Sequence, residues 1–151
     1  MEYISAEEFL KQPVEVQRVF IEWWKPTEGD LVNKVVYIHN IKCNKVGCID
    51  YEWWQEIKED DDIDINNVED IKQFVSDWIS DIPLLTEGQL RKFIEYKKQC
   101  KIDIQNCEDA TYLYLYDLND LEGMHLEEYA IGTTDLLQAY WKVACEIAKE
   151  C

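Results

Sequence analysis

The stretch TYLYLYDL, at Thr111–Leu118, decides the fold because its apolar and tyrosine side chains alternate strictly. Successive side chains of an extended chain point to opposite faces, so Leu113 and Leu115 fall on one face. The tyrosines fall on the other face: Tyr112, Tyr114 and Tyr116. This period of two predicts a β-strand.

Further elements are predicted on both sides of this strand. KIDIQ, at Lys101–Gln105, alternates in the same way, and EEYAI, at Glu127–Ile131, is a weaker third strand. LTEGQL places a capping box of Thr86 and Gln89 before a helix that runs from Glu87 to about Lys98. A helix therefore precedes the predicted strands.

An amphipathic helix ends the chain, and Thr133 or Thr134 is its predicted N-cap. Its apolar side chains recur every three or four residues: Leu137, Tyr140, Trp141, Ala144 and Ile147. This stripe predicts a helix with one face on the core.

The N-terminal half reads mainly as helices. Ser5 and Glu8 form a capping box, and Pro13 suits the start of a second helix, which Pro26 ends. The second helix has an apolar stripe that includes one tryptophan pair: Val16, Val19, Phe20, Trp23 and Trp24. We therefore assign Trp23 and Trp24 to the core.

The following residues predict a strand and two more helices. KVVYIHNI, at Lys34–Ile41, is β-branched and aromatic, hence a strand, and YEWWQEIK forms a short helix capped by Asp50. A longer helix enters through Asn67 and closes before Pro83. Its apolar positions are Val68, Ile71, Phe74, Val75, Trp78 and Ile79.

These patterns predict an α+β fold in which a small antiparallel sheet packs against several amphipathic helices. Residues 1–83 form an N-terminal helical region with one strand and an acidic segment at about 41–70. Residues 84–151 form a C-terminal helix-strands-helix subdomain. A chain of 151 residues is expected to fold as one compact unit.

The charge is concentrated in two windows. The chain carries a net charge of −17, and residues 50–70 hold ten Asp or Glu against one base, Lys58. Residues 102–141 hold nine Asp or Glu and no Lys or Arg. Such surfaces repel nucleic acid and membrane headgroups and attract basic clefts, although acidic blocks also serve solubility alone.

Cysteines and acids leave two metal alternatives open. His39, Cys43 and Cys48 are three zinc-ligand types, but no Cys pair has the usual close spacing. The alternation of carboxylates in DDDIDINNVED suggests calcium, yet the glycine and glutamate positions of the EF-hand template are Ile65 and Ile71. Ordinary reduced cysteines and a helix-initiating loop are the preferred interpretations.

Three segments resemble a group of known sequences: FIEWWKPTEGDLV, PLLTEGQLRKFIE and DLLQAYWKVACEIAKE. They are similar to small accessory proteins encoded by phages and prophages of low-GC Gram-positive bacteria. The likeness covers the first thirty residues and much of Pro83–Cys151, whereas Ile41–Asp70 looks like an insertion or a divergent segment. The resemblance implies a protein that binds host machinery, since phage proteins of this size include inhibitors of CRISPR and other defences.

The residues favour a binding protein over an enzyme. We find no phosphate loop, nucleophile motif, metalloprotease motif or CxxC, and nothing brings His39 and His125 together. No cofactor, resident metal, direct nucleic-acid contact or membrane contact is expected. The N-terminus has no basic and apolar signal-peptide pattern, so we expect the cytoplasm of a host bacterial cell.

The leading hypothesis is a non-catalytic inhibitor that binds the basic cleft of a host defence protein, such as a CRISPR effector, by mimicking nucleic acid. Carboxylates would pair with Arg and Lys of the cleft, and aromatic side chains would anchor the interface. The expected partner-binding residues are Trp53, Trp54, Glu59, Asp60, Asp61, Asp62 and Asp64. Trp53 and Trp54 are therefore expected at the surface, in contrast to Trp23 and Trp24.

Two alternatives remain. A sponge for a small nucleotide immune signal would need cationic side chains, and the only basic concentration is Arg91, Lys92, Lys97, Lys98 and Lys101. That cluster is also typical of an ordinary solvated helix face. A structural or regulatory oligomer without a ligand is the other alternative.

Overall fold

The structure is a computed structural model that describes residues 2–78, 82–119 and 125–151, with only the backbone for Trp78, His125 and Leu126. The described residues form six helices and five strands in two antiparallel sheets, so the predicted α+β class is confirmed. The chain divides into two compact units. The N-terminal unit comprises Ser5–Lys11 and Gln17–Leu84, and the C-terminal unit comprises Met1–Ile4, Gln12–Val16 and Leu85–Cys151.

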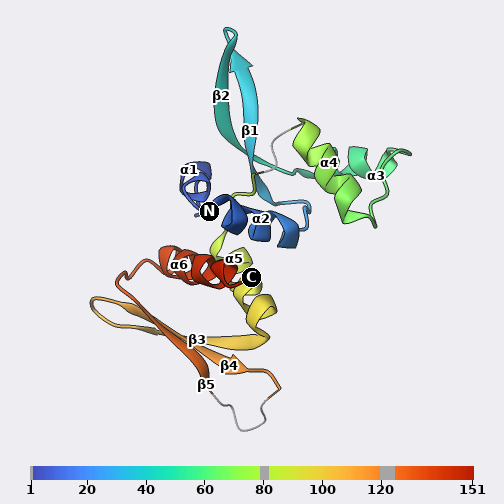
Figure 1. Cartoon of the computed structure of the whole chain (residues 1–151). Coiled ribbons are helices and arrows are strands. Elements are labelled where there is room, and N and C mark those ends of the chain that lie inside the picture. Colours follow the sequence, from blue (N-terminus) through green and yellow to red (C-terminus); the bar gives the residue numbers. More distant parts are fainter. Residues whose placement is uncertain (1, 79–81, 120–124) are drawn as a thin grey trace. The chain divides into compact units, whose positions relative to one another are not determined.

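The C-terminal unit is a three-stranded antiparallel sheet with two helices on one face (Figure 1). Its elements are α5 (Glu87–Lys98), β3 (Cys100–Asn106), β4 (Thr111–Asp117), β5 (His125–Ile131) and α6 (Leu136–Lys149). The strand order is β3-β4-β5, and the predicted faces of β4 are confirmed. Leu113 and Leu115 are fully buried, while the three tyrosines of β4 are only partly buried.

Local capping explains where the helices of this unit begin. The predicted box at α5 is confirmed, because Gln89 N donates to Thr86 Oγ1 at 3.4 Å and Thr86 N donates to Gln89 Oε1 at 2.9 Å. The predicted cap of α6 is wrong. Asp135, directly before Leu136, accepts from Gln138 N at 3.1 Å, whereas Thr133 Oγ1 accepts from Asp135 N. The residue adjoining the first turn is the one that reaches its free N–H groups.

The N-terminal unit contains α1 (Ala6–Leu10), most of α2 (Val14–Trp23), β1 (Leu31–Ile38), β2 (Ile41–Cys48), α3 (Tyr51–Glu59) and α4 (Val68–Trp78). The Ser5–Glu8 capping box of α1 is confirmed, as is the Asp50 cap of α3. Helix α2 begins at Val14, one residue after Pro13. The expected helical position Ile79 lies outside the described residues.

The predicted strand over Lys34–Ile41 is confirmed for Lys34–Ile38, within β1, and is wrong beyond Ile38. The segment instead turns at His39 and Asn40, both with positive φ (50° and 65°), and returns as β2. Two consecutive residues with positive φ make the tight turn whose twist matches a β-hairpin, and Asn and His tolerate this conformation better than most residues. The predicted acidic segment at 41–70 therefore begins with a strand that contains no acid.

The core of the N-terminal unit combines buried aliphatic side chains with tryptophans. Its buried members are Trp24, Val32, Ile49, Ile71 and Val75. Trp24 is 3% exposed, and its Nε1 donates to Asp30 Oδ2 at 2.9 Å. Trp23 is only partly buried, so the assignment of both tryptophans to the core is confirmed for Trp24 alone. The fully buried stripe runs through every fourth residue, Val16, Phe20 and Trp24, and leaves Trp23 beside it.

Candidate partner-binding surface

Helix α3 presents one acidic face, and Asp50 fixes the first turn of this helix. The Asp50 carboxylate accepts from Trp53 N at 2.8 Å, and Ile57 is fully buried. Glu52 and Glu56 lie one helical turn apart on the exposed side. The helix therefore carries carboxylates outward while its apolar side is fixed on the core.

The loop after α3 continues the acidic face in a defined conformation. Asp60 Oδ1 accepts from Asp62 N, and Asp64 Oδ1 accepts from Asn66 N, each at 2.9 Å. Asp70 Oδ2 accepts from Asp64 N at 3.3 Å. The first two bonds, in which the carboxylate accepts from the N–H two residues later, are the Asx turns in which Asp is favoured. The carboxylates thus shape the loop between α3 and α4 themselves.

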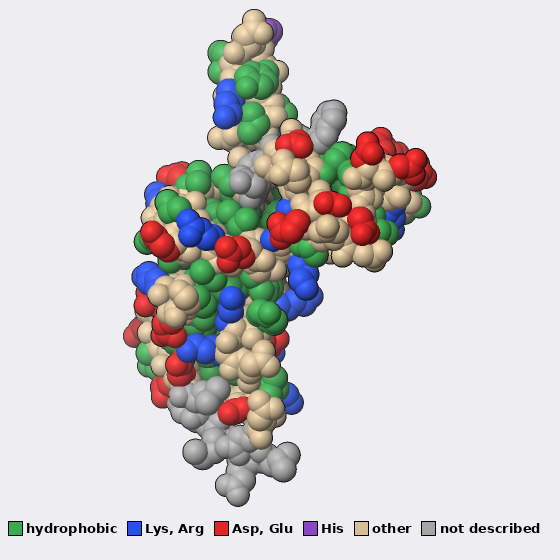
Figure 2. Space-filling model, turned by 45° about the vertical axis from the view of Figure 1, so that its right-hand side comes forward, with side chains coloured by type: hydrophobic (Ala, Val, Ile, Leu, Met, Phe, Trp, Pro, Cys, Tyr) green, Lys and Arg blue, Asp and Glu red, His purple; other side chains and the backbone are tan. Residues whose placement is uncertain are grey.

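We define the acidic surface as the exposed carboxylates of α3, the loop and the start of α4: Glu52, Glu56, Glu59, Asp60, Asp61, Asp62, Asp64 and Glu69. Figure 2 shows acidic side chains gathered over this part of the molecule. None of the eight forms an ion pair with any residue that the structure describes. The one base of the window, Lys58, lies 5.8 Å from the centre of the Trp54 ring. Among the described residues, this negative charge is offset only in part, by Lys58 and by the electrostatic interaction of Glu69 with Lys72.

Trp53 and Trp54 lie beneath this surface rather than projecting from it. Both are partly buried and pack against the same core as Trp24. The Trp53 ring lies 5.4 Å from that of Phe74 on α4, with the planes tilted by 38°. Each indole also retains an exposed part. The two side chains hold α3 on the core and leave an aromatic edge beside the carboxylates.

The predicted binding residues therefore come together in one region, and three more acids join them. Glu52, Glu56 and Glu69 were missing from the sequence-based set. The sequence contains a pattern that could have identified two of them. Glu52 and Glu56 precede Asp60 at intervals of four residues, which is the spacing of one helix face. Glu69 lies in the first turn of α4, within the acidic window at residues 50–70.

The zinc alternative does not fit the hairpin. His39 is in the turn, and Cys43 and Cys48 are both on β2. Five residues along a strand span about 17 Å and place the two thiols on opposite faces. A zinc ion needs ligands within about 2.3 Å, so these residues cannot share one ion. Within the described ranges, no group of three or more His, Cys, Asp or Glu converges on a metal position.

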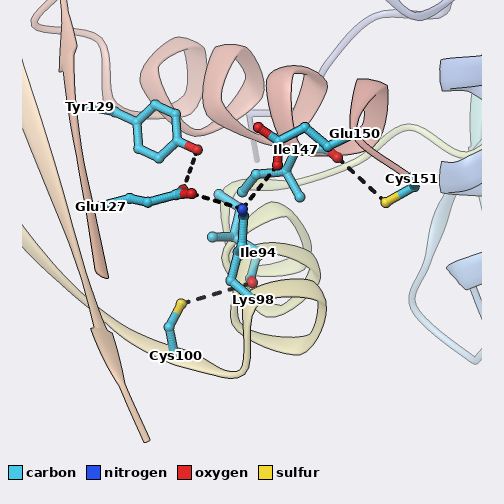
Figure 3. Close-up of polar contacts among 8 residues, drawn as sticks. All are labelled: Ile94, Lys98, Cys100, Glu127, Tyr129, Ile147, Glu150 and Cys151. Carbon is cyan, nitrogen blue, oxygen red and sulfur yellow. Dashed lines mark hydrogen bonds and ion pairs between the residues drawn. The ribbon is translucent and has the colours of Figure 1, made fainter. Parts of the chain in front are cut away.

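Two members of the basic cluster proposed for a nucleotide site, Arg91 and Lys98, are occupied by internal ion pairs. Arg91 Nε donates to Glu95 Oε1 at 2.9 Å. Lys98 donates to Glu127 Oε1 at 3.0 Å and to Glu150 Oε2 at 2.9 Å, so it joins α5, β5 and the end of α6 (Figure 3). Because carboxylates already hold these two cations, the nucleotide alternative gains no support from them.

Figure 3 shows that Lys98 belongs to a larger polar cluster on the helix side of the sheet. Tyr129 donates to Glu127 Oε2 at 2.6 Å, and the pKa of Tyr129 is raised, first by burial and then by this bond. Burial acts to lower the pKa of Lys98, but hydrogen bonds to Glu150 and Glu127 outweigh it and the pKa is raised. Both groups therefore keep their protons, which suits a structural role.

A hollow of about 370 Å³ on the C-terminal unit offers no activated nucleophile. Trp141, Cys145 and Lys149 of α6 contribute to its lining. Burial raises the pKa of Cys145 to about 12, so its thiol stays protonated at neutral pH. The hollow therefore carries no argument for nucleophilic catalysis.

No protein-family model, characterised protein or solved structure matches the chain. The class follows from the fold and the surface: an α+β protein of two compact units, one of which presents eight exposed carboxylates that form no ion pair within the described part of the chain. Within the described residues, no helix is both long and apolar enough to span a membrane.

Proposed function

We propose that this protein is a non-catalytic inhibitor whose acidic surface occupies a basic, nucleic-acid-binding cleft of a host defence protein. The resemblance to phage accessory proteins suggests a CRISPR effector as the partner and the cytoplasm of a bacterial host as the place of action. The proposal rests on one observation above all: the carboxylates of the acidic surface are exposed and form no ion pair with the residues that the structure describes.

The placement of these carboxylates suits recognition of a cleft that holds phosphates. Glu52 and Glu56 repeat along α3 at one turn, about 6 Å, and the loop adds four aspartates beyond them. A row of like charges on an ordered element attracts Arg and Lys over about one Debye length, roughly 8–10 Å at physiological salt. The turn bonds of Asp60 and Asp64 keep the loop ordered before binding, which lowers the entropy lost in the complex.

The tryptophans add an apolar part to the proposed interface. Partly exposed indoles beside charged groups are typical of residues that dominate interface energies. In this proposal Trp53 and Trp54 contribute their exposed edges, while the acidic surface supplies steering and ion pairs. Their larger role in the free protein is to hold α3 in place.

The test is a target-DNA cleavage assay with a panel of purified, guide-loaded CRISPR effectors. The variant replaces Asp60, Asp61, Asp62 and Asp64 with Asn, which keeps the Oδ1 acceptors of the turns and removes only charge. The matched control neutralises four exposed acids elsewhere that form no ion pair with a described residue: Glu15, Glu28, Glu108 and Asp109.

We expect the wild-type chain to inhibit one effector class, the control variant to inhibit equally, and the loop variant to lose at least tenfold in potency. The potency of the wild type should also fall with rising salt, more steeply than that of the loop variant. Failure to inhibit any effector, or equal potency of the loop variant and the wild type at low salt, would contradict the proposal.

A further inference from the structure

The sheet of the C-terminal unit has one face that the helices do not cover. Helices α5 and α6 both lie on the side of Leu113 and Leu115, and the opposite face is open in Figure 1. Down the centre of the open face run the three tyrosines of β4, all partly buried. Their cross-strand neighbours are exposed residues: Lys101, Asp103, Gln105, Glu128 and Ala130.

The strand register places Tyr114 between two carboxylates. Asp103 of β3 and Glu128 of β5 are its partners on either side, so the three side chains form one row across the sheet. Directly opposed side chains have Cβ atoms about 5 Å apart. Neither carboxylate pairs with a cation in the part of the chain that the structure describes.

The ring of Tyr114 is held in position. It stacks near Tyr112, with ring centres 6.5 Å apart and planes at 16°, and its hydroxyl donates to Gln105 Oε1 at 3.2 Å. The pKa of Tyr114 is raised, first by desolvation and then by the charge of Glu128. A fixed aromatic surface with flanking carboxylates loses little entropy when a ligand is placed on it.

This arrangement matches the chemistry of one side chain. A guanidinium group is planar, stacks on aromatic rings and donates two parallel hydrogen bonds to a carboxylate. A lysine ammonium forms the ion pair but has neither the plane for stacking nor the bidentate geometry. Phosphate groups are repelled by the carboxylates, so a nucleic-acid strand does not fit the face.

We propose that the face formed by Tyr112, Tyr114, Asp103 and Glu128 binds an arginine-presenting segment of a protein partner. Arginine stacks on the tyrosine rings and donates to the carboxylate on either side. Asp103 and Glu128 belong to the second acidic window of the sequence, which holds nine acids and no base. The proposal therefore assigns a binding role to part of that window. The proposal stands on the C-terminal unit alone and does not require the acidic surface of the N-terminal unit.

The probe is a flexible Gly/Ser peptide that carries four arginines, compared with its lysine analogue of equal charge by calorimetry at about 0.15 M salt. The test variant combines Asp103→Asn with Glu128→Gln. The matched control combines Glu108→Gln with Asp109→Asn, exposed acids in the turn between β3 and β4. Both variants change the net charge by the same amount, so only position differs.

We expect the arginine peptide to bind the wild type about two- to fivefold more tightly than the lysine peptide, the range expected for cation–π contacts at exposed sites. Asp103→Asn with Glu128→Gln should weaken arginine-peptide binding about tenfold, and the control less than twofold. Equal affinity for the two peptides, or equal weakening by the variant and the control, would overturn the proposal.

The contribution of the ring is tested separately. Tyr114→Phe should keep the preference for arginine, and Tyr114→Leu should abolish it. Because Tyr114→Leu also alters sheet packing, amide chemical shifts of the wild type are followed during titration with the arginine peptide. The largest changes should fall on β3, β4 and β5, and changes confined to α3 and its loop would refute the assignment.

Discussion

Replacing Lys98 with Met should destabilise the protein measurably, because Lys98 bonds to two carboxylates on different elements. Its side chain is 20% exposed, whereas Glu127 is 36% and Glu150 is 58% exposed. A hydrogen bond to a charged group contributes about 1.5–3 kcal/mol when shielded from water, and an exposed ion pair about 0.2–1 kcal/mol. Discounting for this exposure, we assign about 1 kcal/mol to the Glu127 bond and about 0.5 kcal/mol to the Glu150 bond.

The expected loss for Lys98→Met is therefore about 1.5 kcal/mol in the free energy of unfolding, or roughly 3–6 °C in Tm for a chain of this size. Thermal and urea unfolding followed by circular dichroism measure it. Lys92→Met is the matched control, since Lys92 is an exposed lysine of the same helix, and its effect should stay within about 0.5 kcal/mol. Equal effects of the two substitutions would refute the reasoning.

Three further outcomes follow from particular contacts. Burial acts to raise the pKa of Glu127, but bonds from Tyr129 and Lys98 hold it below its ordinary value of 4.5. The stability from Glu127 is thus present above about pH 4.5 and is lost as the pH falls through the lower folded pKa. Glu127→Gln should therefore reduce the pH dependence of the free energy of unfolding in that range, measured by urea unfolding at several pH values. Trp24→Phe should lower stability by about 2–3 kcal/mol, measured by urea unfolding, since it removes the bond to Asp30 and leaves a cavity. Asp135→Ala should lower Tm through the loss of about 1 kcal/mol at the α6 cap, while alanine at Thr134, an exposed residue, should change it little.

The sequence predicted those elements whose signal is local. The alternation in β4 and the capping boxes at Ser5 and Thr86 involve residues within a few positions, and the structure confirms them. The hairpin turn at His39 and Asn40 was missed because its residues lack the Asn-Gly or Asp-Gly signature of such turns. The contacts of Lys98 were also missed, since Glu127 and Glu150 lie 29 and 52 residues away.

The two Glu-Trp-Trp triplets, at Glu22–Trp24 and Glu52–Trp54, differ less than the sequence suggested. All four tryptophans contact one core, and only Trp24 is fully buried within it. A substitution at Trp53 or Trp54 therefore removes packing between α3 and the core as well as any contact with a partner. Loss of binding in such a variant is informative only if its unfolding transition is unchanged. The aspartates of the loop are free of this ambiguity, because Asn preserves their turn bonds, so the acidic surface and not the tryptophan pair is the decisive place to test the proposed function.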